Sequence, residues 1–125
     1  MKIVYERLDK TLHDREDFDC GESLLNDFLL KQATQRQKRH DAVTHVAVQL
    51  YNDKYPKKIL GFYTLTNNAL FYSSFPNQHV KILPELQAVP SVKIARFARN
   101  KRYTNPGFGE HLLIDALKYI YKMAT

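Results

Sequence analysis

The segment between residues 99 and 111 contains the residue types that bind a phosphate. Its sequence is Arg-Asn-Lys-Arg-Tyr-Thr-Asn-Pro-Gly-Phe-Gly-Glu-His, and it joins a predicted strand to a predicted helix. A short loop that opens a helix presents free backbone N–H groups, and the helix dipole adds positive charge at the same place. Gly107 and Gly109 let the main chain approach an anion without an intervening Cβ. The segment predicts an anion site, although a plain capping loop with a turn at Pro106 fits the same residues.

Histidine and cysteine are the other side chains that could do chemistry. His45, His79 and His111 are candidate bases because an unperturbed imidazole has a pKa of about 6.5. The sequence places none of them well, since His45 lies at a strand start and His111 in the first turn of a helix. Structural or surface roles are favoured for both. Cys20 has no His or Asp at a spacing that indicates a nucleophile, so we expect a packed thiol. No histidine pair has metal-ligand spacing, so we expect no metal site.

The charge of the chain is positive and unevenly distributed. The 125 residues contain 19 Lys and Arg against 13 Asp and Glu, a formal net charge of +6. Residues 93–125 contain seven basic and two acidic side chains, whereas residues 1–20 contain four and six. A basic face attracts nucleic acid, nucleotide cofactors and anionic membranes alike, and it also fits an ordinary solvated surface.

Composition predicts one globular domain, residues 1–125, of a size that forms a core without disulfides. The single cysteine favours a reducing compartment, and we expect a cytoplasmic protein. No apolar run approaches the ~20 residues of a membrane span, and the charged start is not typical of a signal peptide. We therefore expect no membrane partner.

Hydrophobic periodicity predicts an α+β fold with the order β-α-β-β-β-α, in which helices flank a mostly antiparallel sheet. One amphipathic helix is expected over about 21–38, after a cap and an acidic first turn within residues 19–23. Residues 73–91 indicate an irregular loop with a short helical turn near 82–87. The expected strands cover 2–8, 44–51, 59–66 and 92–98, with a hairpin between the second and third. A last helix follows Gly109, with an apolar stripe of Leu112, Leu113, Ala116, Leu117, Ile120 and Tyr121.

Three segments resemble the GNAT family of acetyl-CoA-dependent N-acetyltransferases. They are residues 18–29, 60–66 and 96–113, and the resemblance extends from about residue 2 to the end of the chain. The first of them, Phe-Asp-Cys-Gly-Glu-Ser-Leu-Leu-Asn-Asp-Phe-Leu, is the most specific. It is similar to the branch of toxins from toxin–antitoxin pairs that acetylate the amino group of aminoacyl-tRNA.

The resemblance implies acetyl-CoA as cofactor, with its pyrophosphate at residues 104–109 and its pantetheine arm along the fourth strand. Thr104 replaces the usual Gln or Arg of the family's loop, and Pro106 has no N–H to donate. Lys101 lies where its charge could reach the phosphates. The implied cofactor-binding residues are Phe97, Ala98, Arg99, Arg102, Thr104, Asn105, Gly107, Phe108, Gly109 and Glu110.

The resemblance also implies partners. The basic end of the first helix, Arg36, Lys38 and Arg39, is expected to hold tRNA. A ribbon-helix-helix antitoxin is a further expected partner, and the unpaired edge beside the fourth strand favours a homodimer.

Family members continue past the last helix into a strand, a helix with a Tyr that protonates the departing thiolate, and a final strand. We therefore expect a C-terminally truncated member that lacks the usual C-terminal strands, or one whose missing strand comes from a second copy of the chain, and we assign no catalytic residue. The alternative is an inactive remnant that acts as a binding module.

Overall fold

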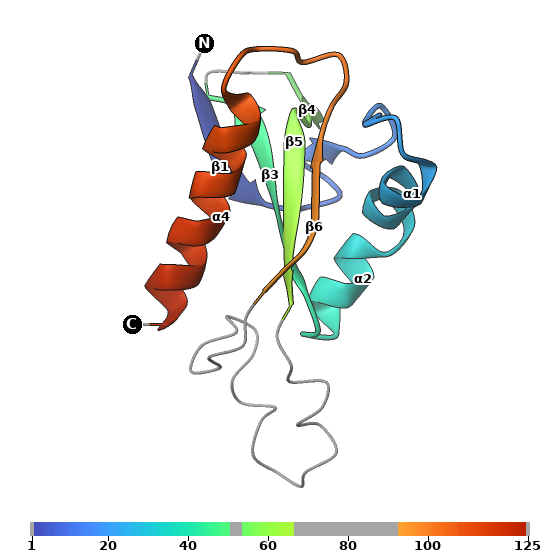
Figure 1. Ribbon diagram of the computed structural model, residues 1–125. Coiled ribbons are helices and arrows are strands. Elements are labelled where there is room, and N and C mark those ends of the chain that lie inside the picture. Colours follow the sequence, from blue (N-terminus) through green and yellow to red (C-terminus); the bar gives the residue numbers. More distant parts are fainter. Residues whose placement is uncertain (1, 51–53, 67–92, 125) are drawn as a thin grey trace, which may run out of the picture.

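A four-stranded antiparallel sheet forms the centre of the protein in the computed structural model, which describes residues 2–50, 54–66 and 93–124 (Figure 1). The sheet order is β1-β3-β5-β6, and every neighbouring pair is antiparallel. Helices α1 and α2 lie on one side of the sheet and α4 on the other, which confirms the predicted α+β fold. The bounds are β1 Ile3–Arg7, α1 Ser23–Lys31, α2 Ala33–Lys38, β3 Val43–Gln49, β5 Gly61–Thr66, β6 Lys93–Arg99 and α4 Phe108–Ala124.

A second sheet of two short strands was not predicted. In it, β2 (His13–Asp14) pairs in parallel with β4 (Lys57–Lys58). His13 is fully buried there and its Nε2 lies 2.9 Å from Glu6 Oε1, while Lys57 Nζ lies 3.1 Å from Glu6 Oε2. These contacts join the small sheet to β1.

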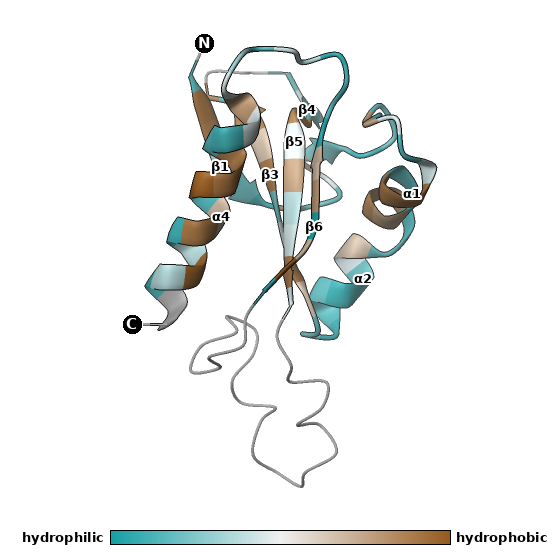
Figure 2. Ribbon diagram, in the orientation of Figure 1, coloured by the Kyte–Doolittle hydropathy of each residue, from teal (hydrophilic) through white to brown (hydrophobic). Residues whose placement is uncertain are grey.

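The side chains of the main sheet divide into two cores, as the alternation of strand residues requires. Phe62 faces α1, where its ring centroid lies 6.4 Å from that of Phe28. Tyr63 faces α4 and donates a hydrogen bond of 2.6 Å to Asp115. Between the two faces, β3 is buried over six of its seven residues. Figure 2 shows apolar residues along the strands, α1 and α4, whereas α2 is largely hydrophilic.

The prediction of one helix over 21–38 is wrong, because the chain forms two helices that break at Gln32. Gln32 has φ −122° and ψ −31°, outside the helical range. The break lets α2 bury Ala33 and place the amide of Gln37 between two strands. These contacts depend on residues far away in the sequence, so helical periodicity alone does not indicate them.

The expected cap and acidic first turn are also wrong in detail. The N-cap residue of α1 is Glu22, which makes no side-chain capping bond, and the first turn has no acidic residue. The Asp19 carboxylate instead accepts hydrogen bonds from the N–H of Gly21 and from the side chain of Asn26. Asp19 therefore orders the turn before the helix rather than the helix end.

The last helix confirms the predicted element but only part of its apolar stripe. Leu112 and Ala116 are buried against the sheet, whereas Leu113, Leu117 and Tyr121 are exposed by 41%, 51% and 72%. The irregular loop predicted over 73–91, with its helical turn, lies outside the described residues. No helix in the described ranges has both the length and the apolar character that crossing a bilayer requires.

We expect Gly61→Ala to destabilise the fold, since a Cβ at this position would lie 2.9 Å from the Phe108 ring and 3.0 Å from the Ala98 carbonyl oxygen. Overpacking of this kind costs about 1–3 kcal/mol, measurable as a lower free energy of unfolding in urea. The matched control is Gly109→Ala, where an added Cβ meets nothing within 4 Å. The control should be neutral or stabilising because alanine favours helix. Equal stability of the two variants would contradict this packing.

Candidate functional site

The loop between β6 and α4 is anchored at its start by Asn100, a buried residue that sequence reasoning missed. Its N–H donates to the Leu60 carbonyl at 2.9 Å, and its side-chain amide donates to the Ile59 carbonyl at 3.2 Å. Its side-chain oxygen accepts from the N–H of Arg102 at 3.0 Å. A turn-forming Asn that bonds two residues ahead is a known local pattern, so this anchor could have been predicted.

Phe108 anchors the other end of the loop. Its side chain is only 3% exposed and packs on Gly61, and the Tyr103 ring meets it edge-on with centroids 4.8 Å apart. Its N–H donates to the Asn105 carbonyl at 3.2 Å. Phe108 was predicted to bind cofactor, but both its side chain and its N–H are engaged within the protein. Its observed role is to fix the start of α4.

The loop and the first turn of α4 offer free main-chain donors to solvent. Across the described residues, no protein acceptor is found for the N–H groups of Thr104, Asn105, Gly107, Gly109 and Glu110. Gly107 has φ +81°, a conformation that favours glycine, and space around both glycines is open. These donors lie at the N-terminus of a 17-residue helix, where the dipole adds positive charge. The arrangement can bind an anionic group such as a phosphate.

A hollow of about 390 Å³ adjoins these donors. It is lined by the loop residues Asn105, Pro106 and Gly107, by His111 on α4, and by Lys2 before β1. The hollow therefore lies beside the helix start, on the side of the molecule where β1 begins. Lys2 provides the cation of this lining.

The predicted cofactor residues of β6 lie on both faces of that strand. Phe97 is 36% exposed and shares a face with Tyr63, whereas Ala98 is buried on the α1 side opposite Phe62. Arg99 is exposed. Among the described strands, none pairs with the outer edge of β6. Its outward main-chain groups can therefore accept an extended ligand in the manner of an added strand.

The chain is similar in sequence to known toxins. It is 28% identical over 123 residues to the probable toxin TacT of Sinorhizobium fredii, covering 98% of this chain and 66% of that protein. It is 26% identical over 104 residues to a tRNA-acetylating toxin of Mycobacterium tuberculosis, covering 83% of this chain and 58% of that toxin. No protein-family model matches the chain.

Solved structures of similar fold point the same way. The complex of AtaTR with AcCoA has a TM-score of 0.70 at 22% identity, covering 96% of this chain and 66% of that one. AtaT with acetyl-methionyl-tRNAfMet has a TM-score of 0.67 at 21% identity, covering 97% and 70%. The chain has the fold of these toxins. It spans somewhat less than two thirds of the two toxins matched by sequence.

In this chain the two cations expected to reach phosphates are already engaged. Lys101 Nζ lies 3.0 Å from Asp19 Oδ2, and Arg102 lies 3.1 Å from Asp17 Oδ1. The N–H of Gly21 and then Lys101 lower the pKa of Asp19 to about 2. These contacts tie the start of the loop to the segment before α1, so phosphate contact by either cation would compete with an ion pair.

The candidate bases do not gather at β6. His111 Nδ1 lies 2.7 Å from the Tyr5 hydroxyl, and the two rings stack. His45 is buried between Tyr63 and Tyr119, and its Nδ1 has no hydrogen-bond partner in the described part of the chain. His79 lies outside the described residues. No described histidine is placed to take a proton at the exposed edge of β6.

The predicted RNA-binding residues sit at the far end of the sheet from the loop (Figure 1). Lys38 lines a hollow beside β1. Arg36 has a buried Nε that finds no partner among the described residues, and its charge acts on Arg96. Arg39 lies 3.9 Å from Asp41. The structure thus separates the loop from the basic end of α2.

His45 makes stability depend on pH. Burial, and to a lesser extent the Arg7 charge, lowers the pKa of His45 to about 4 from an ordinary 6.5. The unfolded chain therefore binds more protons between these values, and stability falls as pH falls. Because of His45, the free energy of unfolding should fall by about 2 kcal/mol between pH 7 and pH 5, as measured by urea unfolding. His45→Gln should lose that dependence, and identical pH profiles for both proteins would contradict the assignment.

Proposed function

We propose that the protein is an acetyl-CoA-dependent N-acetyltransferase whose acceptor is the amino group of an aminoacyl-tRNA. The observation that carries the proposal is similarity along 98% of the chain to a toxin, together with the loop that leads into α4. We call residues 104–110 the free-amide loop, because most of their N–H groups have no acceptor among the described residues. A relative is named a tRNA-acetylating toxin, and AtaT has been solved with an acetylated aminoacyl-tRNA. Those names describe the relatives and support the same reaction here.

The residues present fit the cofactor. The open space at Gly107 and Gly109 would accept a diphosphate, and the N–H groups of Gly107, Gly109 and Glu110 would donate to its oxygens. The outer edge of β6, from Phe97 to Arg99, would pair with the amide-bearing arm. When bound, acetyl-CoA supplies an acetyl group activated as a thioester. Thr104 and Asn105 add two further main-chain donors.

The reaction requires a neutral amine, a polarised thioester carbonyl and close approach of the amine to that carbonyl. Backbone N–H groups on β6 can polarise a carbonyl at the edge of the strand. A free α-amino group has a pKa of about 7.7–8.0, so much of it is already neutral near pH 8. Positioning by the loop and by β6 is therefore the main contribution that the described residues make.

We further propose a cytoplasmic homodimer with an antitoxin partner of the ribbon-helix-helix type. AtaT has been solved with the antitoxin AtaR, and KacTA with DNA, which supports a partner of this kind. The rest of the outer edge of β6, from Lys93 to Arg96, supports pairing between copies, because an exposed edge strand favours association.

Gly107→Asp should weaken acetyl-CoA binding. The new carboxylate would stand beside the phosphates in space that is now open, and a side chain at φ +81° is strained. Titration calorimetry should show micromolar affinity for the parent and at least tenfold weaker binding for the variant, about 1.4 kcal/mol.

Gly21→Asp is the matched control for this variant. Gly21 also has positive φ, +89°, and open space around it, so the strain and the added charge are the same. The control should bind acetyl-CoA like the parent. Unaltered affinity in Gly107→Asp would show that the loop does not bind the phosphates.

The full reaction is tested by mixing the protein with acetyl-CoA and charged tRNA. Mass spectrometry of the released amino acid should show a mass increase of one acetyl group. Acetyl-CoA binding without any acetylated product would support the alternative, a binding module that has kept the fold but does not catalyse.

A further inference from the structure

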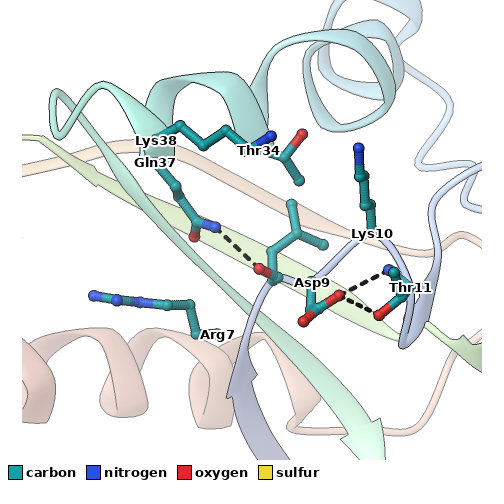
Figure 3. Close-up of a pocket in the computed structure, with 8 residues that line it drawn as sticks. Arg7, Asp9, Lys10, Thr11, Thr34, Gln37 and Lys38 are labelled. Carbon is teal, nitrogen blue, oxygen red and sulfur yellow. Dashed lines mark hydrogen bonds between the residues drawn. The ribbon is translucent and has the colours of Figure 1, made fainter.

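A second hollow, of about 360 Å³, lies between the end of β1 and helix α2 (Figure 3). We call it the basic groove and define it by Arg7, Asp9, Lys10, Thr34 and Lys38. Its cations come from two segments about 30 residues apart in the sequence. Of these residues, sequence reasoning identified only Lys38.

The floor of the basic groove is held rigidly. The Gln37 side chain donates to the Leu8 carbonyl at 3.0 Å and accepts from the N–H of Thr44 at 2.9 Å. The N–H of Leu8 donates to the Thr44 carbonyl at 2.9 Å, and the Leu8 side chain is buried. Helix α2, β1 and β3 are thus linked at one point, so the groove is a fixed feature of the fold.

The basic groove has a net positive charge, and its cations form no ion pairs among the described residues. In the described part of the chain, Arg7, Lys10 and Lys38 form no ion pair with a carboxylate. Asp9 Oδ1 accepts hydrogen bonds from the Thr11 hydroxyl and N–H, and these bonds lower the pKa of the Asp9 carboxyl. Three cations against one carboxylate give the groove a net charge of +2. Figure 3 shows Asp9 turned toward Thr11 rather than toward the lysines.

These features favour a nucleic-acid backbone over an acidic polypeptide. Phosphodiesters carry one charge each at regular spacing, which suits cations distributed along an open hollow. The groove also offers polar groups that can bond a ribose 2′-hydroxyl, namely the second Asp9 oxygen and the Thr34 hydroxyl.

The groove lies at the end of the sheet where β6 begins. Arg7 pairs with His45 in β3, Val43 pairs with Leu65 in β5, and Thr66 pairs with Lys93 in β6. The free-amide loop follows Arg99, at the opposite end of β6. A polyanion in the groove would therefore lie away from the phosphates of a cofactor bound at the loop.

We propose that the basic groove binds the ribose-phosphate backbone of the acceptor RNA through Arg7, Lys10 and Lys38. This inference rests on the proposed function for the identity of the RNA. It adds a defined binding surface, separate from the loop, through which the acceptor is held.

The test is binding of deacylated tRNA without acetyl-CoA, followed by fluorescence anisotropy across a range of KCl concentrations. The double variant Lys10→Gln/Lys38→Gln should bind about tenfold more weakly at low salt, and its slope of log affinity against log salt should fall by about 2. Lys58→Gln/Lys118→Gln is the matched control, since it removes two exposed cations outside the groove. The control should change the slope by much less.

Equal losses in the two double variants would overturn the proposal, because they would show an effect of net charge alone. Retained tRNA binding with lost polyglutamate binding in the groove variant would also overturn it, in favour of an acidic protein partner. Circular dichroism should show the same melting temperature for the parent and both variants.

Calorimetry with acetyl-CoA separates this inference from the proposed function. The groove variant should bind acetyl-CoA like the parent. Groove-dependent tRNA binding by a protein that acetylates nothing would leave the groove assignment standing and remove the enzymatic one.

Discussion

The packing of the Phe108 ring on Gly61 is the constraint on which the candidate cofactor site depends. The ring fills the space that any side chain at position 61 would occupy, so the start of α4 lies directly against β5. Asn100 fixes the other end of the loop by bonding the backbone of residues 59 and 60. With both ends held, several N–H groups of the loop and of the first turn of α4 have no acceptor among the described residues. An anion site requires rigid donors that have no other partner, since little conformational entropy of the loop is then lost when the anion binds.

The sheet places the two proposed anion-binding surfaces at its two ends. The free-amide loop uses main-chain dipoles and glycines, and its neighbouring cations Lys101 and Arg102 are tied to aspartates. The basic groove instead uses side-chain charges that lack carboxylate partners within the described residues. The loop thus fits a compact diphosphate, while the groove fits an extended polyanion. Strand β6 runs from one end to the other and keeps its outer edge open among the described strands.

Local patterns predicted the elements, and long-range contacts decided what the local patterns left open. The patterns within 44–51, 59–66 and 92–98 correctly predicted three strands, which the structure places at 43–49, 61–66 and 93–99, because side chains alternate between two packed faces. The break at Gln32 was missed because it allows hydrogen bonds from Gln37 to Leu8, just after β1, and to Thr44 in β3. Likewise, the ion pair of Arg102 joins it to a residue 85 positions earlier, which no spacing argument shows. The glycine loop was predictable from residue types, whereas the basic groove needed the fold to bring Lys10 and Lys38 together.

The central claim is that the backbone amides at the start of α4 bind the diphosphate of acetyl-CoA. The most direct measurement follows the amide resonances of ¹⁵N-labelled protein while acetyl-CoA is added. The account predicts saturable shifts that are largest for the N–H groups of Gly107, Gly109 and Glu110, with little change at Gly21. Saturable shifts confined to other residues, or no shifts at millimolar ligand, would contradict it.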